Sequence, residues 1–253
     1  MKKSIVWNLV SVVLGSAAVA PTALAAEGVS FSVGLRAWGN QWSTWDVYPG
    51  ASENFTSGTR VAVLPTVGVR FGSFLASASH FARKSYDFQG NTGNFSAKRQ
   101  ETDILGGYYV LPTLALTLGH KTVKQDFGGT AQFKYSGPIF GMVASAPLTS
   151  GFSLYGTIGL GRMKASLPLQ DAGGSSRLDA DYFLGEVGVA YSLNPGSLVP
   201  GAKAMALTAG YRNQVLATKG FKVPLSTTNS SLYRSTDLRD TTEGFTLGFT
   251  LSF

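Results

Sequence analysis

The last eleven residues of the chain alternate strictly between apolar and polar side chains. The apolar positions are Phe245, Leu247, Phe249, Leu251 and Phe253. Glycine, threonine and serine occupy the positions between them. A period of two residues is typical of a β-strand with one apolar and one polar face. Taken alone, the segment also fits an edge strand of a soluble β-sandwich.

Nine further segments show related alternation and are separated by turn residues. With the last one they predict ten strands, at about 28–40, 59–71, 74–86, 99–111, 114–124, 132–146, 152–165, 180–193, 203–216 and 237–253. The sixth segment is the least regular, because Pro138 interrupts it and its phase is mixed. Eight strands is therefore the alternative count.

The connections between these segments alternate in length. Those near 72, 112, 147–151 and 194–202 are mostly short, whereas those near 47–58, 87–98, 125–131, 167–178 and 217–236 are mostly longer and polar. Short turns at one end and long loops at the other are typical of membrane-spanning β-barrels. The pattern therefore predicts an all-β fold, a transmembrane up-and-down antiparallel barrel.

The N-terminal segment has the pattern of an export signal. Lys2 and Lys3 precede an apolar run that ends near Leu14, and the triplet 23–25 is Ala-Leu-Ala. A charged start, an apolar run and small residues at a cleavage site indicate a secretory signal peptide. A membrane anchor is the alternative, but the run is too short to span a bilayer. We therefore expect residues 1–25 to be removed and residues 26–253 to form one barrel domain.

Composition agrees with many strands that have one face in lipid. Charged residues make up 14% of the chain and aromatic residues 12%, and there are 31 glycines. There is no cysteine, which excludes disulfides and thiolate metal sites. The net charge is +7, or +5 once Lys2 and Lys3 are removed (7 − 2). The basic residues are scattered, so no nucleic-acid partner is expected, although a positive exterior can attract anionic lipopolysaccharide or solutes.

The end of the last segment carries a motif. The spacing of Thr246, Gly248, Leu251 and Phe253 resembles the C-terminal assembly signal of bacterial outer-membrane β-barrel proteins. The resemblance implies a place in the outer membrane of a Gram-negative bacterium, among lipid and lipopolysaccharide. It also implies that the barrel-assembly machinery reads the last strand, which then closes the barrel against the first. It assigns no other functional residue.

If the apolar faces contact lipid, the polar faces line the lumen. That lumen is then expected to hold seven charged side chains: Arg36, Arg70, Glu101, Asp103, Lys121, Glu186 and Arg212. Asp103 and Lys121 lie nearly opposite each other across the turn at 112, and Glu186 and Arg212 lie at similar height on neighbouring strands. Because charges away from water are costly unless paired, we expect a ladder of salt bridges. The alternative is a charged constriction that selects solutes.

The sequence shows no obvious catalytic or metal site. His80 and His120 are the two histidines, and neither has a serine or aspartate partner nearby in sequence. The pattern of the barrel proteases of the omptin type does not map onto this chain. We therefore expect no catalytic residue, no metal and no cofactor, with a hydrolase at the rim as the less favoured alternative.

Aromatic residues gather after the first segment. Trp38, Trp42, Trp45 and Tyr48 are expected to join an aromatic girdle at the membrane surface, and contact with a ligand is the alternative. The sequence thus favours a narrow porin-like channel passing small solutes, or a structural envelope component. Surface binding by loops such as 217–236 is the other function kept open.

Overall fold

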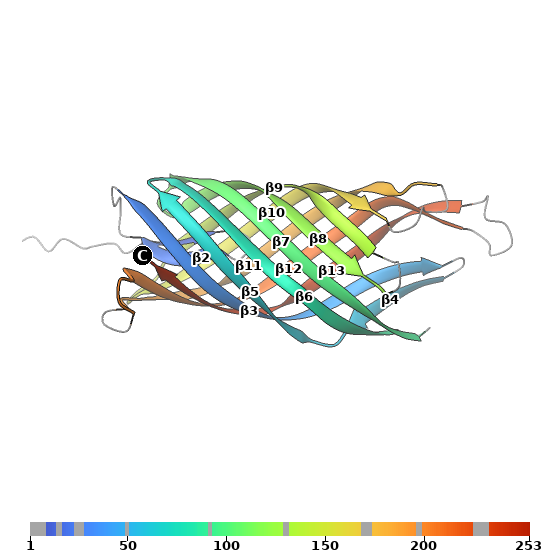
Figure 1. The fold of residues 1–253 in the computed structure, drawn as a ribbon, viewed down its shortest axis with the longest axis horizontal. Helices are drawn as coiled ribbons and strands as arrows, with labels where there is room; N and C mark the ends of the chain where they lie inside the picture. Colours follow the sequence, from blue (N-terminus) through green and yellow to red (C-terminus); the bar gives the residue numbers. More distant parts are fainter. Residues whose placement is uncertain are drawn as a thin grey trace, which may run out of the picture.

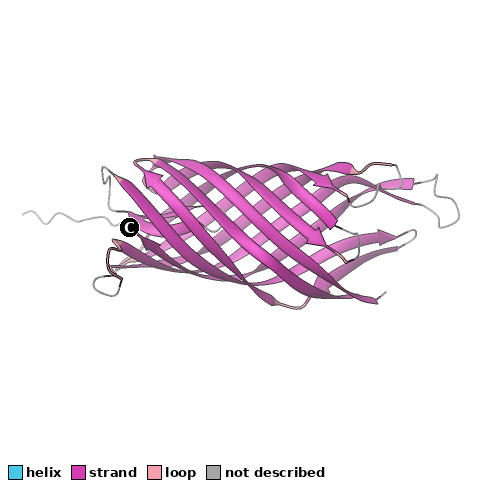
Figure 2. Ribbon diagram, in the orientation of Figure 1, coloured by secondary structure: helices cyan, strands magenta, loops and turns pink. Residues whose placement is uncertain are grey.

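The structure is a computed structural model. It describes residues 9–13, 17–22, 28–48, 51–90, 93–128, 132–167, 174–195, 199–224 and 233–253. These residues form strands and turns and no helix (Figure 2). In particular, the described part of the chain contains no helix long and apolar enough to cross a membrane.

One antiparallel sheet curls into a closed barrel (Figure 1). Its strands are β3 (Val29–Tyr48), β4 (Ala51–Ser57), β5 (Arg60–Phe71), β6 (Phe74–Gly90), β7 (Gly93–Leu111), β8 (Leu114–Asp126), β9 (Gln132–Pro147), β10 (Phe152–Ser166), β11 (Arg177–Leu193), β12 (Ala204–Pro224) and β13 (Tyr233–Ser252). Each strand from β6 to β12 pairs with the next in sequence, as an up-and-down barrel requires.

The eleven described strands occupy ten positions around the barrel. β4 and β5 lie end to end, and each pairs with β3 on one side and β6 on the other. The prediction of ten strands is confirmed in this sense, and the alternative of eight is wrong. The sixth segment, the least regular in sequence, is the full strand β9, which continues through Pro138.

The last strand closes the barrel against the first, as its motif implied. β13 pairs with β3 from Asp240 opposite Thr44 to Ser252 opposite Ser32, and the amide of Phe253 donates to the carbonyl of Phe31 at 2.8 Å. Of the motif, Thr246 faces the interior and Leu251 the exterior.

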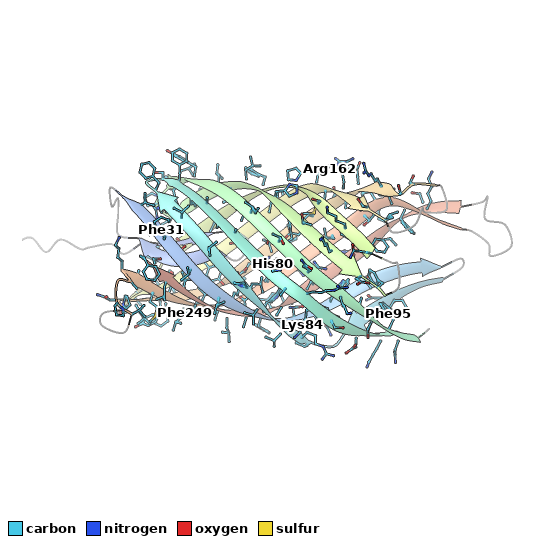
Figure 3. All side chains as sticks on the ribbon, viewed as in Figure 1. Phe31, His80, Lys84, Phe95, Arg162 and Phe249 are labelled. Atoms are coloured by element: carbon cyan, nitrogen blue, oxygen red, sulfur yellow. The ribbon has the colours of Figure 1, made fainter. Side chains whose placement is uncertain are left out.

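The outer surface divides the barrel into two parts. Large apolar side chains lie exposed on the half near the short turns, such as Phe31 and Phe249 in Figure 3. This band is the surface that a bilayer covers. A transmembrane strand needs about 9–11 residues, whereas β3 has 20 residues, β12 has 21 and β13 has 20. The far half of the barrel therefore projects beyond the band, and we call it the projecting half.

The outer face of the projecting half is polar. Exposed ion pairs cross between its strands and link Arg60 to Asp87, Arg83 to Asp126, Lys164 to Asp179, and Lys219 to Asp237. Neither face of the strands has a regular apolar stripe here, so the sequence pattern underestimated the length of the strands. The long connection expected at 87–98 is wrong, since β6 reaches Gly90 and β7 begins at Gly93.

The aromatic girdle is also corrected in part. Trp38 and Trp42 lie inside the barrel and are fully buried, because they continue the inward phase of Arg36 along β3. Their rings pack against Phe81, and against Tyr86 and Phe88, respectively. The side chains of Trp45 and Tyr48 lie outside the described residues.

A short hairpin precedes the barrel strands. β1 (Leu9–Val13) pairs with β2 (Ala17–Thr22), and the backbone of the hairpin lies next to β9 and β12. It belongs to the segment predicted to be a signal peptide. The expected cleavage triplet 23–25 lies outside the described residues, so removal of this segment stays a prediction.

Candidate functional site in the barrel interior

Six of the seven charges expected in the lumen are buried there. These are Arg36, Glu101, Asp103, Lys121, Glu186 and Arg212. The seventh, Arg70, is half-buried near the short turns, where its guanidinium lies 4.3 Å from the ring centre of Tyr109. Its Nε donates to the carbonyl of Gly72 at 2.8 Å. The inward charges therefore form two ion-pair networks, with Arg70 apart from them.

Glu186 is the centre of the first network. Its Oε2 lies 2.8 Å from Nη1 of Arg36 and 3.4 Å from Nη1 of Arg212, while Oε1 accepts from the hydroxyl of Tyr155 at 2.9 Å. Arg36 comes from β3 and Glu186 from β11, which are separated around the closed barrel by β12 and β13. The contact therefore joins two strands that are not neighbours through the interior. The guanidinium of Arg212 lies over the ring of Trp38, 5.1 Å from its centre.

Lys121 is the centre of the second network. Its Nζ donates to Oε2 of Glu101 and to Oδ1 of Asp103, both at 2.7 Å. Glu101 also accepts from Nε of Arg99 at 2.7 Å. The ring of Tyr182 lies 5.4 Å from Nζ of Lys121. Arg99 was missed from the sequence, although it shares the inward face of Glu101, because it lay at the expected start of its strand.

Glycines make room for the large interior side chains. A Cβ on Gly188 would lie 2.7 Å from the ring of Tyr155, and one on Gly210 would lie 2.5 Å from its hydroxyl. These glycines of β11 and β12 thus let the ring of Tyr155 lie along the inner wall and reach Glu186 on the neighbouring strand. Lys121 and Arg212 are each 0% exposed. At mid-height the lumen is therefore filled by paired charges and aromatic rings, as in other small barrels.

A third feature lies above the networks, inside the projecting half. A cavity of about 390 Å³ is lined by Thr44, Phe55, Phe95, Gln125, Phe127, Phe133, Tyr135, Phe221, Leu238 and Asp240. We call it the mouth cavity. Asp240 is 6% exposed, and the outward residue before it, Arg239, is exposed to water, so this part of β13 lies beyond the apolar band. Burial raises the pKa of the Asp240 carboxyl.

The two histidines lie on the outer face rather than in the lumen. Nε2 of His120 lies 2.9 Å from Oγ of Ser136, and Nδ1 of His80 lies 3.0 Å from Oγ1 of Thr102. Sequence reasoning could not pair His120 with Ser136, because the partner is on the next strand. Among the described residues, no carboxylate hydrogen-bonds to either imidazole, and no group of three or more His, Cys, Asp or Glu could hold a metal.

No family model matches this chain, and neither does any curated protein. Solved structures do match. The outer membrane protease OmpT of Escherichia coli has 11% identity and a TM-score of 0.45, with 89% of this chain and 96% of that one covered. The toluene transporter TodX of Pseudomonas putida has 10% identity and a TM-score of 0.31, with 90% of each chain covered. A FadL homologue of Pseudomonas aeruginosa has 9% identity and a TM-score of 0.32, with 89% and 90% covered. At such low similarity no activity, substrate or residue is carried over to this chain.

Proposed function

We propose that this protein is a closed outer-membrane barrel of a Gram-negative bacterium, a structural envelope component that holds its projecting half above the lipid. Lipid and lipopolysaccharide surround its apolar band. The observation that carries the proposal is the filling of the lumen by the two ion-pair networks. Of the two functions that the sequence favoured, a narrow channel and a structural component, this geometry supports the second.

Buried ion pairs would block an ion halfway along the lumen. A conducting pore needs polar groups that water can hydrate and that an ion can approach and leave. Here the buried carboxylates Glu101, Asp103 and Glu186 are each within 2.8 Å of a cationic nitrogen. Tyr155 and Tyr182 occupy the space beside them. Passage would require these pairs to separate and leave buried charges without partners, and the loss of one partner from a buried ion pair costs about 3–5 kcal/mol.

The proposal includes no catalytic role. His120 and Ser136 belong to a row of polar side chains that crosses the outer face, in which His80 faces Thr102, Thr102 faces Thr122 and Thr122 faces Ser136. This row lies where the apolar band gives way to the charged outer face, a level at which polar side chains are favoured. The row accounts for both histidines without a reaction.

Single-channel recording of refolded residues 26–253 in a planar bilayer tests the proposal. Residues 26–253 do not include the hairpin β1–β2. If this fragment does not conduct, the block must therefore come from the barrel itself. Refolding is checked by heat-modifiable mobility on a gel. We expect a folded protein with no steady conductance, and a steady, salt-dependent conductance of the unaltered chain would overturn the proposal.

A matched pair of variants shows whether the first network closes the lumen. Replacing Arg36, Glu186 and Arg212 together with serine removes the network without leaving a buried charge unpaired. We expect this variant to conduct. Replacing Arg60 and Asp87 with serine removes an exposed pair of the projecting half, and this control is expected to stay silent.

A further inference from the structure

The mouth cavity has the size of a small-molecule site. Its volume is about 390 Å³, within the range of roughly 300–1,000 Å³ that ligand pockets occupy. It lies above both ion-pair networks, so its properties do not depend on whether the lumen conducts. It goes beyond the proposed envelope role, which assigns no ligand.

The wall of the cavity is a continuous series of aromatic rings. Phe55 packs edge-on against Phe95, with ring centres 5.0 Å apart. Phe95 lies 6.0 Å from Phe127, which packs edge-on against Phe133 at 5.5 Å. Phe95, Phe127 and Phe133 are only partly buried. These rings face inward on the projecting half, so they cannot contact the bilayer. Their exposed faces are therefore available to an apolar ligand.

The polar part of the lining is centred on Asp240. Its Oδ1 accepts from Nε1 of Trp42 and its Oδ2 from Nε2 of Gln125, both at 3.3 Å. Hydrogen bonds to a charged carboxylate are usually shorter, about 2.7–2.9 Å. The side chains of Thr44 and Tyr135 also hydrogen-bond to the carboxylate. The hydrogen-bond partners of Asp240 among the described residues are therefore all neutral groups.

Asp240 also differs from the other buried carboxylates in its charge partners. Glu101, Asp103 and Glu186 each form an ion pair, whereas no ion pair to Asp240 occurs among the described residues. The nearest buried cation on this side is Arg99, whose Nε is bound to Glu101 at 2.7 Å and whose guanidinium lies over the ring of Trp42. Arg99 acts on Asp240 through its charge, but no cation among the described residues is bound directly to this carboxylate, which borders the aromatic rings of the mouth cavity.

We propose that the mouth cavity binds a small organic cation, an ammonium group on an aromatic or alkyl body. The ammonium binds the carboxylate of Asp240, and the body lies against Phe55, Phe95, Phe127 and Phe133. Aromatic faces are electron-rich and attract cations, and the attraction grows where water is excluded. A carboxylate beside such faces favours a cation over a neutral molecule and disfavours an anion.

The test uses three probes that share one body and differ in their polar group: 2-phenylethylamine, 2-phenylethanol and phenylacetate. Binding to refolded residues 26–253 in detergent is measured by isothermal titration calorimetry at neutral pH. We expect the amine to bind about tenfold or more tighter than the alcohol, and the acid to bind weakest of the three. Equal affinities, or no binding of the amine, would overturn the proposal.

Variants separate the charge from the aromatic faces. Asp240→Asn is expected to weaken the amine about tenfold or more and to leave the alcohol nearly unchanged. Phe127→Leu keeps an apolar wall and is expected to weaken the amine more than the alcohol, because only the ring attracts the cation. Asp237→Asn is the control, since Asp237 lies exposed on the outside of the same strand and pairs with Lys219.

Each variant is first shown to fold by its heat-modifiable mobility. Unchanged amine binding in folded Asp240→Asn would contradict the assignment of the carboxylate. A failure of the proposed envelope role would appear separately, as conductance of the unaltered chain without any probe.

Discussion

Asp103 on β7 and Lys121 on β8 lie directly opposite each other, and their side chains form an ion pair of 2.7 Å inside the barrel. The same ammonium reaches Glu101, two residues along the strand on the same inward face. One lysine therefore holds two carboxylates that would otherwise repel each other in a poorly solvated interior. Lys121 is therefore expected to contribute to the stability of the barrel, and replacing it should lower that stability measurably.

Lys121→Met is expected to destabilise the barrel by about 3–5 kcal/mol, because Glu101 and Asp103 then lose the cation between them. Unfolding by guanidinium in detergent micelles measures the difference. Lys124→Met, on the outward and exposed face of the same strand, is the control and should change stability by about 0.5 kcal/mol or less. Equal effects of the two variants would show that the buried network adds nothing to stability.

Tyr155 and Glu186 should be energetically coupled. The hydroxyl of Tyr155 donates to Glu186 at 2.9 Å, and a hydrogen bond to a charged group contributes about 1.5–3 kcal/mol. Tyr155→Phe should cost about this much in the natural chain and clearly less when Glu186→Gln is already present. Additive losses in the double-mutant cycle would mean that the tyrosine only fills space.

Alternation of period two predicted much of this molecule, and the reason is local. Where one face contacts lipid and the other the lumen, every second residue is apolar, so the strands and the inward charges Arg36 and Glu186 follow directly. The register across the short turn at 112 then brings Asp103 opposite Lys121.

The pattern fails where the outside of the barrel is wet. On the projecting half both faces of the strands carry polar residues, so Arg99 and Asp240 could not be assigned to the interior. A register shift between Phe81 and Lys84 also reverses which residues of β6 face inward. The mouth cavity collects side chains from several strands, and no local signal in the sequence brings these together.

Gly244 is expected to be essential at the seam between β13 and β3. Its φ is +155°, and a Cβ there would lie 1.9 Å from the carbonyl oxygen of Gly39. Gly244→Ala should therefore greatly reduce the folded, heat-modifiable form after refolding. Gly39→Ala is the control from the same seam, because its Cβ would lie 3.9 Å from the nearest atom, and it should fold normally. If the Gly244→Ala variant folds normally, the pairing register between β13 and β3 must differ from the one described here.

Asp240 and Asp237 should affect stability with opposite dependence on pH. Burial raises the pKa of Asp240, so its charged form costs stability at neutral pH, and this cost disappears as the pH falls below the ordinary pKa of an aspartate. The N–H of Gly220 and then Lys219 lower the pKa of Asp237. The Asp237 carboxylate therefore stabilises the fold at pH values above the ordinary pKa of an aspartate. This stabilisation is lost as the pH falls through the lowered pKa that Asp237 has in the folded state.

Chemical unfolding of two variants at a series of pH values checks both signs. Asp240→Asn should stabilise the barrel at neutral pH, with a gain that shrinks toward acid. Asp237→Asn should destabilise it at neutral pH, with a loss that also shrinks toward acid. The same slope for both variants would contradict the burial of Asp240 or the pairing of Asp237.

The pair of His120 and Ser136 is expected to be unreactive. A nucleophilic serine needs a base that a third group orients, and a hole of free N–H donors for the oxyanion. Here no carboxylate bonds to His120 among the described residues, and Ser136 sits mid-sheet, paired with Thr122 on one side and Lys164 on the other. A fluorophosphonate probe should therefore leave the folded protein unlabelled, as it leaves Ser136→Ala unlabelled. Labelling that disappears in both Ser136→Ala and His120→Ala would instead show a working nucleophile on the outer face.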